Sequence, residues 1–499
     1  MEILANLGIG LETALTPANL LYCLAGVALG TLVGVLPGLG PVATIAMLLP
    51  ATFALPPVSA LIMLAGIYYG AQYGGSTTAI LINLPGESSS VVTALDGYRM
   101  AQQGRAGAAL ATSAIGSFFA GTVATFVVAL LGPALANVAL QFRAPEYFSL
   151  MVLGLVASIV LARGSLLKAL GMVVLGLLLG LVGRDLTSGV ARFSFGVSEL
   201  ADGLNFVVVA MGVFGVAEIV RNLESEGRAR VFVQKIGGLM PTREDIGRII
   251  APILRGTALG SLLGILPGGG ALLASFAAYS IEKKVSPRGA EFGTGAIEGV
   301  AAPESANNAG AQTSFIPMLT LGIPSNPVMA LMIGALIIQG IRPGPLVMTE
   351  QPALFWGIVV SMWIGNLFLL VLNLPMIGLW VRLLTIPYHY LYPIILAFSA
   401  IGVLSLSNTE FDVYLMAVFG VLGYVFLKLD CEPAPLLLGF ILGPMMEEYL
   451  RRAMALSRGD PMIFLERPIS AAMLVVAVLA LVAIVLPAVR ATRDKAFVE

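Results

Sequence analysis

Long apolar segments alternate with short polar ones along almost the whole chain. A helix needs about 20 apolar residues to cross the hydrocarbon core of a bilayer, so the pattern predicts an all-α polytopic membrane protein with about 12 transmembrane helices. Several segments are too short to cross alone and predict broken or re-entrant helices. The apolar segments are residues 18–36, 42–66, 108–140, 147–162, 165–183, 204–221, 249–266, 269–282, 327–341, 353–374, 376–386, 391–407, 412–428, 434–446 and 470–490.

Two polar stretches interrupt this pattern. The first runs from Tyr69 to Gly107 and the second from Glu298 to Gly344, and both contain many Ser, Thr, Asn, Gly and Pro residues. A helix in lipid satisfies its own backbone, so polar, broken backbone at membrane depth is tolerated only where protein buries it or where it lines a wet cavity. Paired broken segments of this kind are the best sequence indicator of a transporter's binding site.

The two halves of the chain share short motifs in the same order. GTLVGVLPGLG, which begins at Gly30, matches GSLLGILPGGG, which begins at Gly260. Three further motif pairs follow, at 75–79 and 310–314, at 84–86 and 322–324, and at 103–107 and 339–344. We therefore predict an internal repeat. The first membrane repeat is 1–222, a charged linker loop is 223–247, and the second repeat, with extra C-terminal helices, is 248–499. The residues leave open whether the repeats are parallel or inverted.

Each LPG motif is expected to end one helix just before another begins. Pro37 removes a backbone donor, and the glycines that follow permit tight turns and close backbone approach. The free N–H groups at the start of the next helix favour an anion. The alternative is a kink at which small residues let helices pack closely. The candidate substrate-binding glycines are Gly38, Gly40, Gly268 and Gly269.

Hydroxyl and amide side chains in the two polar stretches are the candidates for binding substrate carboxylates. Serine and threonine can instead bond back to a helix carbonyl, the serine run at 88–90 can be a helix cap, and the second stretch can be a surface loop. The candidates are Gly75, Ser76, Thr77, Thr78, Ser88, Asn307, Asn308, Gln312, Thr313 and Ser325. An acid within a membrane segment is a functional-site hypothesis by default, so Glu304, with Asn83, is a candidate for the coupling ion.

Arginines lie just beyond both polar stretches. Arg99, Arg105 and Arg342 have the geometry to bind carboxylates in a bidentate manner, although most arginines at such places are interfacial anchors. Asp96 is expected to pair with Arg99, its i,i+3 neighbour on a helix.

Composition agrees with the membrane interpretation and excludes other classes. Of 499 residues 58% are hydrophobic and 11% charged, and the net charge of −1 gives no basic surface for nucleic acid. Two cysteines and one histidine, without an HExxH motif, predict no metal site, no cofactor and no enzyme. The Lys and Arg residues of the linker and of the C-terminal tail predict that both are cytoplasmic.

The motifs together resemble a known family. The runs YGGSTTAILINLPGESSSVVTALDGY, GILPGGGALLASF and PESANNAGAQTSFIPMLTLGIP resemble the large membrane subunit of the tripartite tricarboxylate transporter family, and the resemblance extends from about Leu20 to Arg490. It implies a permease of the bacterial inner membrane that works with a small membrane subunit and a periplasmic solute-binding protein. It also implies import of tricarboxylates or related organic carboxylates by symport, driven by a proton or sodium gradient. A stand-alone carboxylate exchanger or channel without a binding protein is the alternative.

Overall fold

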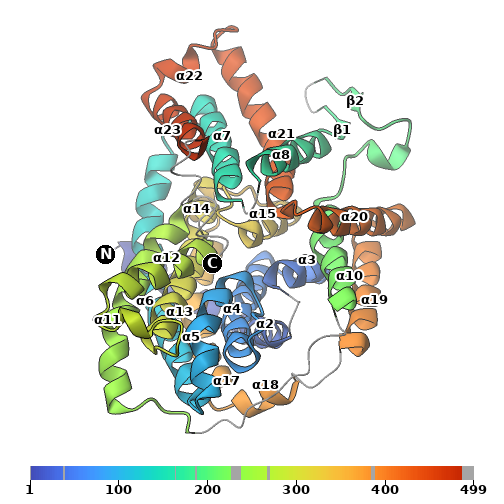
Figure 1. Ribbon diagram of the computed structural model, residues 1–499. Coiled ribbons are helices and arrows are strands. Elements are labelled where there is room, and N and C mark those ends of the chain that lie inside the picture. The colour runs from blue at the N-terminus through green and yellow to red at the C-terminus, as the bar shows by residue number, and fades with distance from the viewer. Residues whose placement is uncertain are drawn as a thin grey trace.

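The chain folds into a bundle of helices (Figure 1). The computed structural model describes residues 2–36, 40–162, 165–185, 188–225, 238–266, 270–383 and 388–485. In this part of the chain the only strands are β1 (Gly183–Arg184) and β2 (Ala191–Arg192), which pair antiparallel in a loop that projects from the bundle (Figure 1). Six helices of the described residues are long and apolar enough to cross a membrane. The chain is thus an all-α polytopic membrane protein; its predicted number of spans stays a prediction.

The helices follow the apolar pattern with a few differences. The first half contains α1 (Glu2–Ala14), α2 (Pro17–Val35), α3 (Pro41–Thr52), α4 (Pro57–Ile82), η1 (Ser88–Ser90), α5 (Val91–Gln102), α6 (Ala106–Ala139), α7 (Ala144–Leu161), α8 (Leu166–Gly180), η2 (Ser198–Leu200), α9 (Phe206–Ala210), the π-helical turn η3 (Met211–Val216) and α10 (Ala217–Ser225). The predicted single segment 42–66 is wrong, because Pro56 and Pro57 begin a new helix there. The segment 108–140 is one long helix, α6.

The second half begins after the linker. It contains α11 (Arg243–Ile265), α12 (Gly270–Val285), η4 (Gly289–Glu291), α13 (Glu298–Thr313), α14 (Phe315–Leu321), α15 (Pro327–Ile338), α16 (Leu346–Glu350), α17 (Pro352–Asn373), α18 (Ile377–Leu383), α19 (Tyr388–Ser407), α20 (Glu410–Lys428), α21 (Pro433–Leu456), α22 (Ile463–Glu466) and α23 (Pro468–Val485).

Glycines at intervals of four residues bring two helix pairs into close contact. On α2 they are Gly26, Gly30 and Gly34, which lie against the backbone carbonyls of Met63, Ile67 and Ala71 on α4. On α11 they are Gly256, Gly260 and Gly264, which lie against the carbonyls of Ala302, Ala306 and Gly310 on α13. Because both series rise in the same order, the two helices of each pair run in the same direction. Only residues without a Cβ permit this approach.

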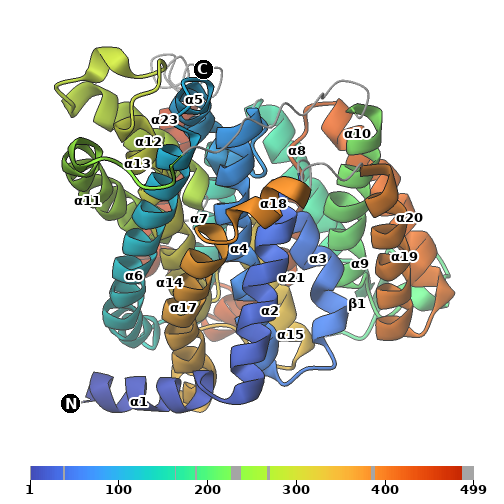
Figure 2. The same cartoon turned by 90° about the horizontal axis from the view of Figure 1, so that it is seen from below.

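The long helix α6 defines two ends of the molecule. Its 34 residues span about 50 Å. Arg105, at its start, forms an ion pair of 2.5 Å with Asp245 at the start of α11, and we call this end the linker face. Ala139, at its end, lies beside the loop that follows α15, and we call this end the opposite face. Figure 2 shows α1 lying across one end of the bundle and the ends of α5 and α10 at the other.

The two close-packed pairs begin at different faces. Helix α1 contacts the start of α17, where Gly10 packs against the carbonyl of Trp356, so α2 begins at the opposite face. Helix α13 begins beside α11, where Arg248 donates to Glu298 at 2.7 and 2.8 Å. The pair α11 and α13 therefore begins at the linker face.

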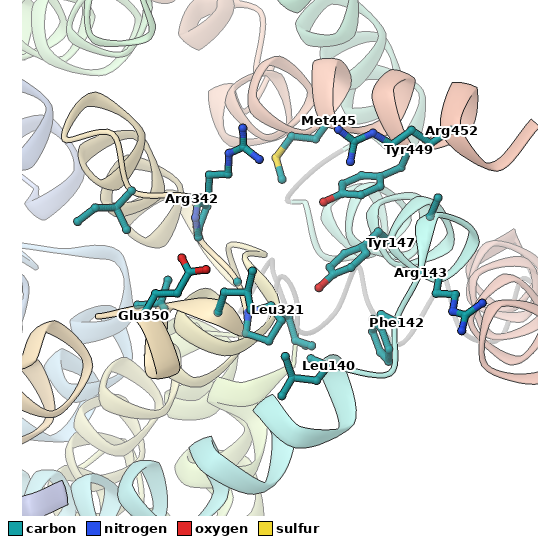
Figure 3. A pocket seen from close by; sticks show the side chains of 18 of the residues that line it. Leu140, Phe142, Arg143, Tyr147, Leu321, Arg342, Glu350, Met445, Tyr449 and Arg452 are labelled. Carbon is teal, nitrogen blue, oxygen red and sulfur yellow. The ribbon is translucent and has the colours of Figure 1, made fainter. Parts of the chain in front are cut away.

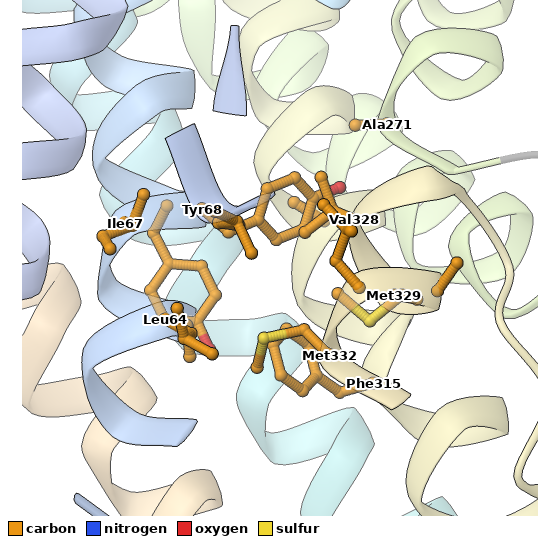
Figure 4. Close-up of a cluster of buried hydrophobic side chains, with 14 of the residues drawn as sticks. Leu64, Ile67, Tyr68, Ala271, Phe315, Val328, Met329 and Met332 are labelled. Atoms are coloured by element: carbon orange, nitrogen blue, oxygen red, sulfur yellow. The ribbon is translucent and has the colours of Figure 1, made fainter. Parts of the chain in front are cut away.

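An apolar cluster fills the space between α4, α14 and α15 (Figure 4). Leu64, Ile67, Phe315, Met329 and Met332 are fully buried within it. Methionine side chains fill irregular gaps of this kind. The cluster packs the part of α4 just before the first polar stretch against α14 and α15 in the middle of the second.

Candidate functional site

Glu304 is the buried acid around which the first polar cluster forms. It lies on α13, whose residues are all buried. Its carboxylate accepts hydrogen bonds from Ser76 of α4, at 2.7 and 2.8 Å, from Ser113 of α6, at 2.8 Å, and from Thr93 of α5. Three other helices therefore supply hydroxyl donors to one acid. Such donors satisfy a carboxylate that is removed from water.

Polar side chains of α13 and α6 form a ladder that extends from Glu304. Asn308 donates to Ser117 Oγ at 2.7 Å, and Thr125 donates to Gln312 Oε1 at 3.0 Å. Residues four apart lie on the same face of a helix, so 304, 308 and 312 face α6 together. The ladder runs from Glu304 toward the middle of the bundle.

A second cluster forms at the break after α4. Ser89 Oγ lies 2.8 Å from Asn307 Oδ1 and 3.0 Å from Gln72 Oε1, and it also contacts the carboxylate of Glu87. Asn307 Nδ2 lies 3.3 Å from Glu87 Oε1. The backbone reaches this place because α4 ends at Asn83, whose φ of 56° is left-handed, and the chain then turns back. Asn307 is one turn from Glu304, so the two buried acids belong to one polar network.

A third cluster forms at the break after α14. Gly322 ends this helix with a φ of 72°, and Asn326 caps α15 by accepting the N–H of Met329 at 3.0 Å. Asn326 Nδ2 donates to Ser314 Oγ at 3.1 Å and to the hydroxyl of Tyr68, on α4, at 3.4 Å. Both breaks thus carry their polar groups against the same face of α4.

The predicted residues fall into three groups. Ser76, Asn307, Asn308, Gln312 and Glu304 join the buried network, Gly75 packs against Glu87, and Ser325 contacts the carbonyl of Ser314 at 3.4 Å. Thr77, Thr78 and Thr313 bond to backbone carbonyls of their own helices, as the alternative interpretation expects. Asn83 and Ser88 are exposed, and Gly40 caps α3, while Gly38, Gly268 and Gly269 lie outside the described residues.

The prediction that Asp96 pairs with Arg99 is wrong. Asp96 is fully buried and accepts the backbone N–H groups of Gly293, Gly295 and Ala296 at 2.8–2.9 Å, and Tyr279 donates to it at 2.8 Å. Its side chain faces the loop before α13 because α5 packs there. Arg99 instead donates to Gln102 at 3.0 Å.

Sequence reasoning did not name several members of the clusters as site residues, although it considered the serine run at 88–90, which includes Ser89, as a helix cap. They are Tyr68, Gln72, Glu87, Ser89, Thr93, Ser113, Ser117, Thr125, Ser314 and Asn326. Glu87 carried a signal, because it is an acid between two apolar segments and beside a Pro-Gly break. The isolated hydroxyls carried none, since single serines and threonines are common in membrane helices.

Some buried polar atoms of the bundle have no protein partner within the described residues. They are the hydroxyls of Tyr69 and Tyr73, Nε2 of Gln312 and both amide atoms of Asn366. Asn366, on α17, lies against Gly121 of α6, between Ser117 and Thr125 of the ladder. Buried polar groups are normally hydrogen-bonded, so unpartnered ones beside a polar network indicate a place for water, an ion or a ligand.

Apolar helices that bury acids, amides and hydroxyls at two helix breaks define a multi-pass membrane protein with a polar interior. Comparison with known proteins gives the family. The chain belongs to the tripartite tricarboxylate transporter TctA family, which it matches over residues 20–438. This is a transporter family, and the match confirms the resemblance seen in the motifs.

Two relatives come from Agrobacterium vitis. The chain is 64% identical to an "uncharacterized 52.8 kDa protein in TAR-I ttuC' 3'region" over 499 residues, which are 100% of this chain and 99% of the relative. It is 63% identical to an "uncharacterized protein in TAR-II ttuC' 3'region" over 240 residues, which are 48% of this chain and 99% of that relative. No solved structure matches the chain.

Proposed function

We propose that the chain is the large permease subunit of a secondary transporter that imports tricarboxylates or related organic carboxylates. One observation carries the proposal: two acids, four carboxamides and several hydroxyls are buried together near the ends of α4 and α14 inside an apolar bundle. Burying such groups is costly unless they serve a function or satisfy each other. Family membership supports this substrate class.

The network suits two tasks. Amide and hydroxyl donors, such as Asn308 and Asn326, are suited to bind carboxylates. Glu304, held by three hydroxyls, is suited to bind a proton or a sodium ion and so to couple uptake to a gradient. No ATP and no cofactor enter this mechanism.

We further infer that the two halves are inverted repeats. The glycines of α2 and α11 are 230 positions apart in sequence, they pack on α4 and α13 in the same way, and the two pairs begin at different faces. Inverted repeats place a substrate site at the middle of the membrane, where broken helices from the two halves meet. The breaks at Asn83 and Gly322, each with a left-handed residue, are equivalent under this relation.

Family membership supports a proposal for the partners. A small membrane subunit would complete the permease, and a periplasmic solute-binding protein would deliver the carboxylate to a permease in the inner membrane. A stand-alone exchanger or channel would need neither partner. Purification of the chain from its native membrane separates the two functions, because only the first requires that a small membrane protein be retained.

The test is uptake of labelled citrate into proteoliposomes that hold the chain, its small membrane subunit and its binding protein. A sodium gradient and a proton gradient are imposed separately, and the binding protein is left out of a control. We expect accumulation under one gradient and none without the binding protein. Equal uptake without the binding protein would support the stand-alone exchanger. If no member of a panel of tri-, di- and monocarboxylates is taken up under either gradient, the proposal is contradicted.

A further inference from the structure

A cavity of about 1140 Å³ opens at the opposite face. It is formed by the end of α6 and the turn into α7, by the loop 340–345 after α15, by α16 and by the last turns of α21 (Figure 3). Small-molecule sites commonly enclose about 300–1,000 Å³, so a small polycarboxylate would fit with its hydration water.

The charges of the cavity are mostly positive. Arg143, Arg342 and Arg452 line it, together with one acid, Glu350. Among the described residues, neither Arg143 nor Arg342 has an ion pair, whereas Arg452 pairs with Glu448 at 2.5 Å. Charges that a protein leaves unpaired on one wall raise the local concentration of counter-ions. Arginine in particular binds carboxylates through two parallel hydrogen bonds.

Two tyrosines add neutral donors. The rings of Tyr147 and Tyr449 are stacked, with centroids 4.8 Å apart and an interplanar angle of 18°. Figure 3 shows both hydroxyls pointing into the cavity on the side that faces Arg342. The guanidinium of Arg452 lies over the ring of Tyr449, 5.8 Å from its centroid, so the stack is held between two helices and a cation.

The turn that carries Arg143 is held by a buried acid. Glu146 accepts the backbone N–H of Arg143 at 2.9 Å and pairs with Arg467 at the start of α23. The acid is 1% exposed on its side chain. Because Glu146 is used in this way, it does not neutralise the guanidinium of Arg143.

The floor of the cavity lies close to the polar interior. Leu321, the last residue of α14, lines the cavity, and Gly322 packs against the carbonyl of Pro343 in the loop after α15. Ser325, which is four residues after Leu321, belongs to the third polar cluster. Four residues span at most about 14 Å, so the cavity ends close to that cluster.

The opposite face is the outer one if the linker is cytoplasmic. The linker and its flanks are rich in Lys and Arg, which favour the cytoplasmic side. The cavity is at the other end of α6 from Asp245, at the start of the helix that follows the linker. It therefore opens where a periplasmic binding protein would release its ligand.

We propose that this cavity is an outer binding site for the substrate, in which Arg342 and the two tyrosines bind the carboxylates of a di- or tricarboxylate before it passes Leu321. The inference rests on the proposed function for the class of the ligand. It assigns a role to Arg342 of the sequence QGIRPG at 339–344, which has no ion pair in the described part of the chain.

The test compares R342Q with R458Q in the reconstituted transporter. Arg458 is exposed and does not line the cavity, so R458Q also removes one positive charge but leaves the lining of the cavity unchanged. We expect R342Q to raise the half-saturating citrate concentration about tenfold, because a charge-assisted bidentate contact is lost, with the maximal rate little changed. R342K is expected to recover part of the loss. R458Q is expected to match the unaltered chain.

A direct measurement separates this inference from the proposed function. Labelled citrate is bound to the purified chain in nanodiscs, without gradients or partners. Weaker binding by R342Q, but not by R458Q, would support the cavity even if uptake failed. Normal uptake kinetics and normal binding in R342Q would overturn the inference and leave the proposed function standing. Equal losses in both variants would also overturn it, because they would show a general effect of surface charge.

Discussion

Glu304 combines burial, charge and hydrogen bonds from three other helices, and it offers the sharpest test at the scale of single residues. We expect E304Q to fold normally, because the hydroxyls of Ser76 and Ser113 can rotate to meet an amide as well as a carboxylate. Gradient-driven uptake should fall by about 100-fold, since an uncharged side chain neither binds a cation nor exchanges a proton. E410Q, an exposed acid at the start of α20, is the matched control for loss of charge. Normal accumulation by E304Q would exclude Glu304 from coupling.

Asp96 stabilises the fold, and this effect can be measured separately from transport. D96A would leave the backbone N–H groups of Gly293, Gly295 and Ala296 without their acceptor in a buried place. Each unsatisfied group costs about 1–3 kcal/mol, so the unfolding temperature in detergent should fall by many degrees. Y279F removes only one donor to the same carboxylate and should cost about 1 kcal/mol. A D96A protein as stable as Y279F would contradict this assignment.

The sequence pointed to some site residues and missed others for a physical reason. Glu304, Asn307 and Asn308 stand out because amides and acids are costly in an apolar segment. The hydroxyls that bind Glu304 are 191 to 228 residues away along the chain, so only the packing of helices identifies them. The sequence does not distinguish Thr77, which donates to a carbonyl of its own helix, from Ser76, which donates both to its own helix and to Glu304.

At the scale of elements, the close packing of α11 on α13 depends on the absence of side chains. A Cβ on Gly260 would lie 2.7 Å from Ala306 Cα, closer than real contacts allow, so G260A must push the helices apart. We expect a loss of about 1–3 kcal/mol, seen as a lower unfolding temperature. G247A, in the same helix, meets nothing within 4 Å and should be neutral or slightly stabilising. Equal melting curves for both variants would show that this contact is not important for stability.

Most helices could be predicted from apolar length, but their breaks could not be located in the same way. The segment expected at 42–66 is divided by prolines, which the apolar pattern alone does not reveal. Residues 69–82 were expected to belong to a broken segment and are instead the regular second half of α4. The break falls at Asn83 and Pro85, because proline does not allow a helical residue before it and asparagine tolerates a left-handed backbone.

At the scale of the whole molecule, repeated motifs indicated two halves but not their orientation. A sequence motif does not reveal in which direction its helix crosses the membrane, because a GxxxG helix packs equally well in either direction. The ion pair of Arg105 with Asp245 and the contact of Gly10 with Trp356 place the starts of α11 and α2 at different faces, and the proposal of inverted repeats is based on this difference. These contacts join residues more than a hundred positions apart, and only the folded chain brings them together.

The two faces can be told apart in intact cells by single cysteines. With Cys23 and Cys431 replaced, F195C lies on the projecting loop after β2, beside the cavity face, and E244C lies at the start of α11. Both positions are highly exposed, at 86% and 75%, so accessibility does not favour either one. A membrane-impermeant thiol reagent should label F195C in intact cells and E244C only after permeabilisation, because the basic linker is expected in the cytoplasm. The reverse pattern would mean that the chain has the opposite orientation in the membrane. The arginine-lined cavity would then open to the cytoplasm, where no binding protein could deliver a substrate.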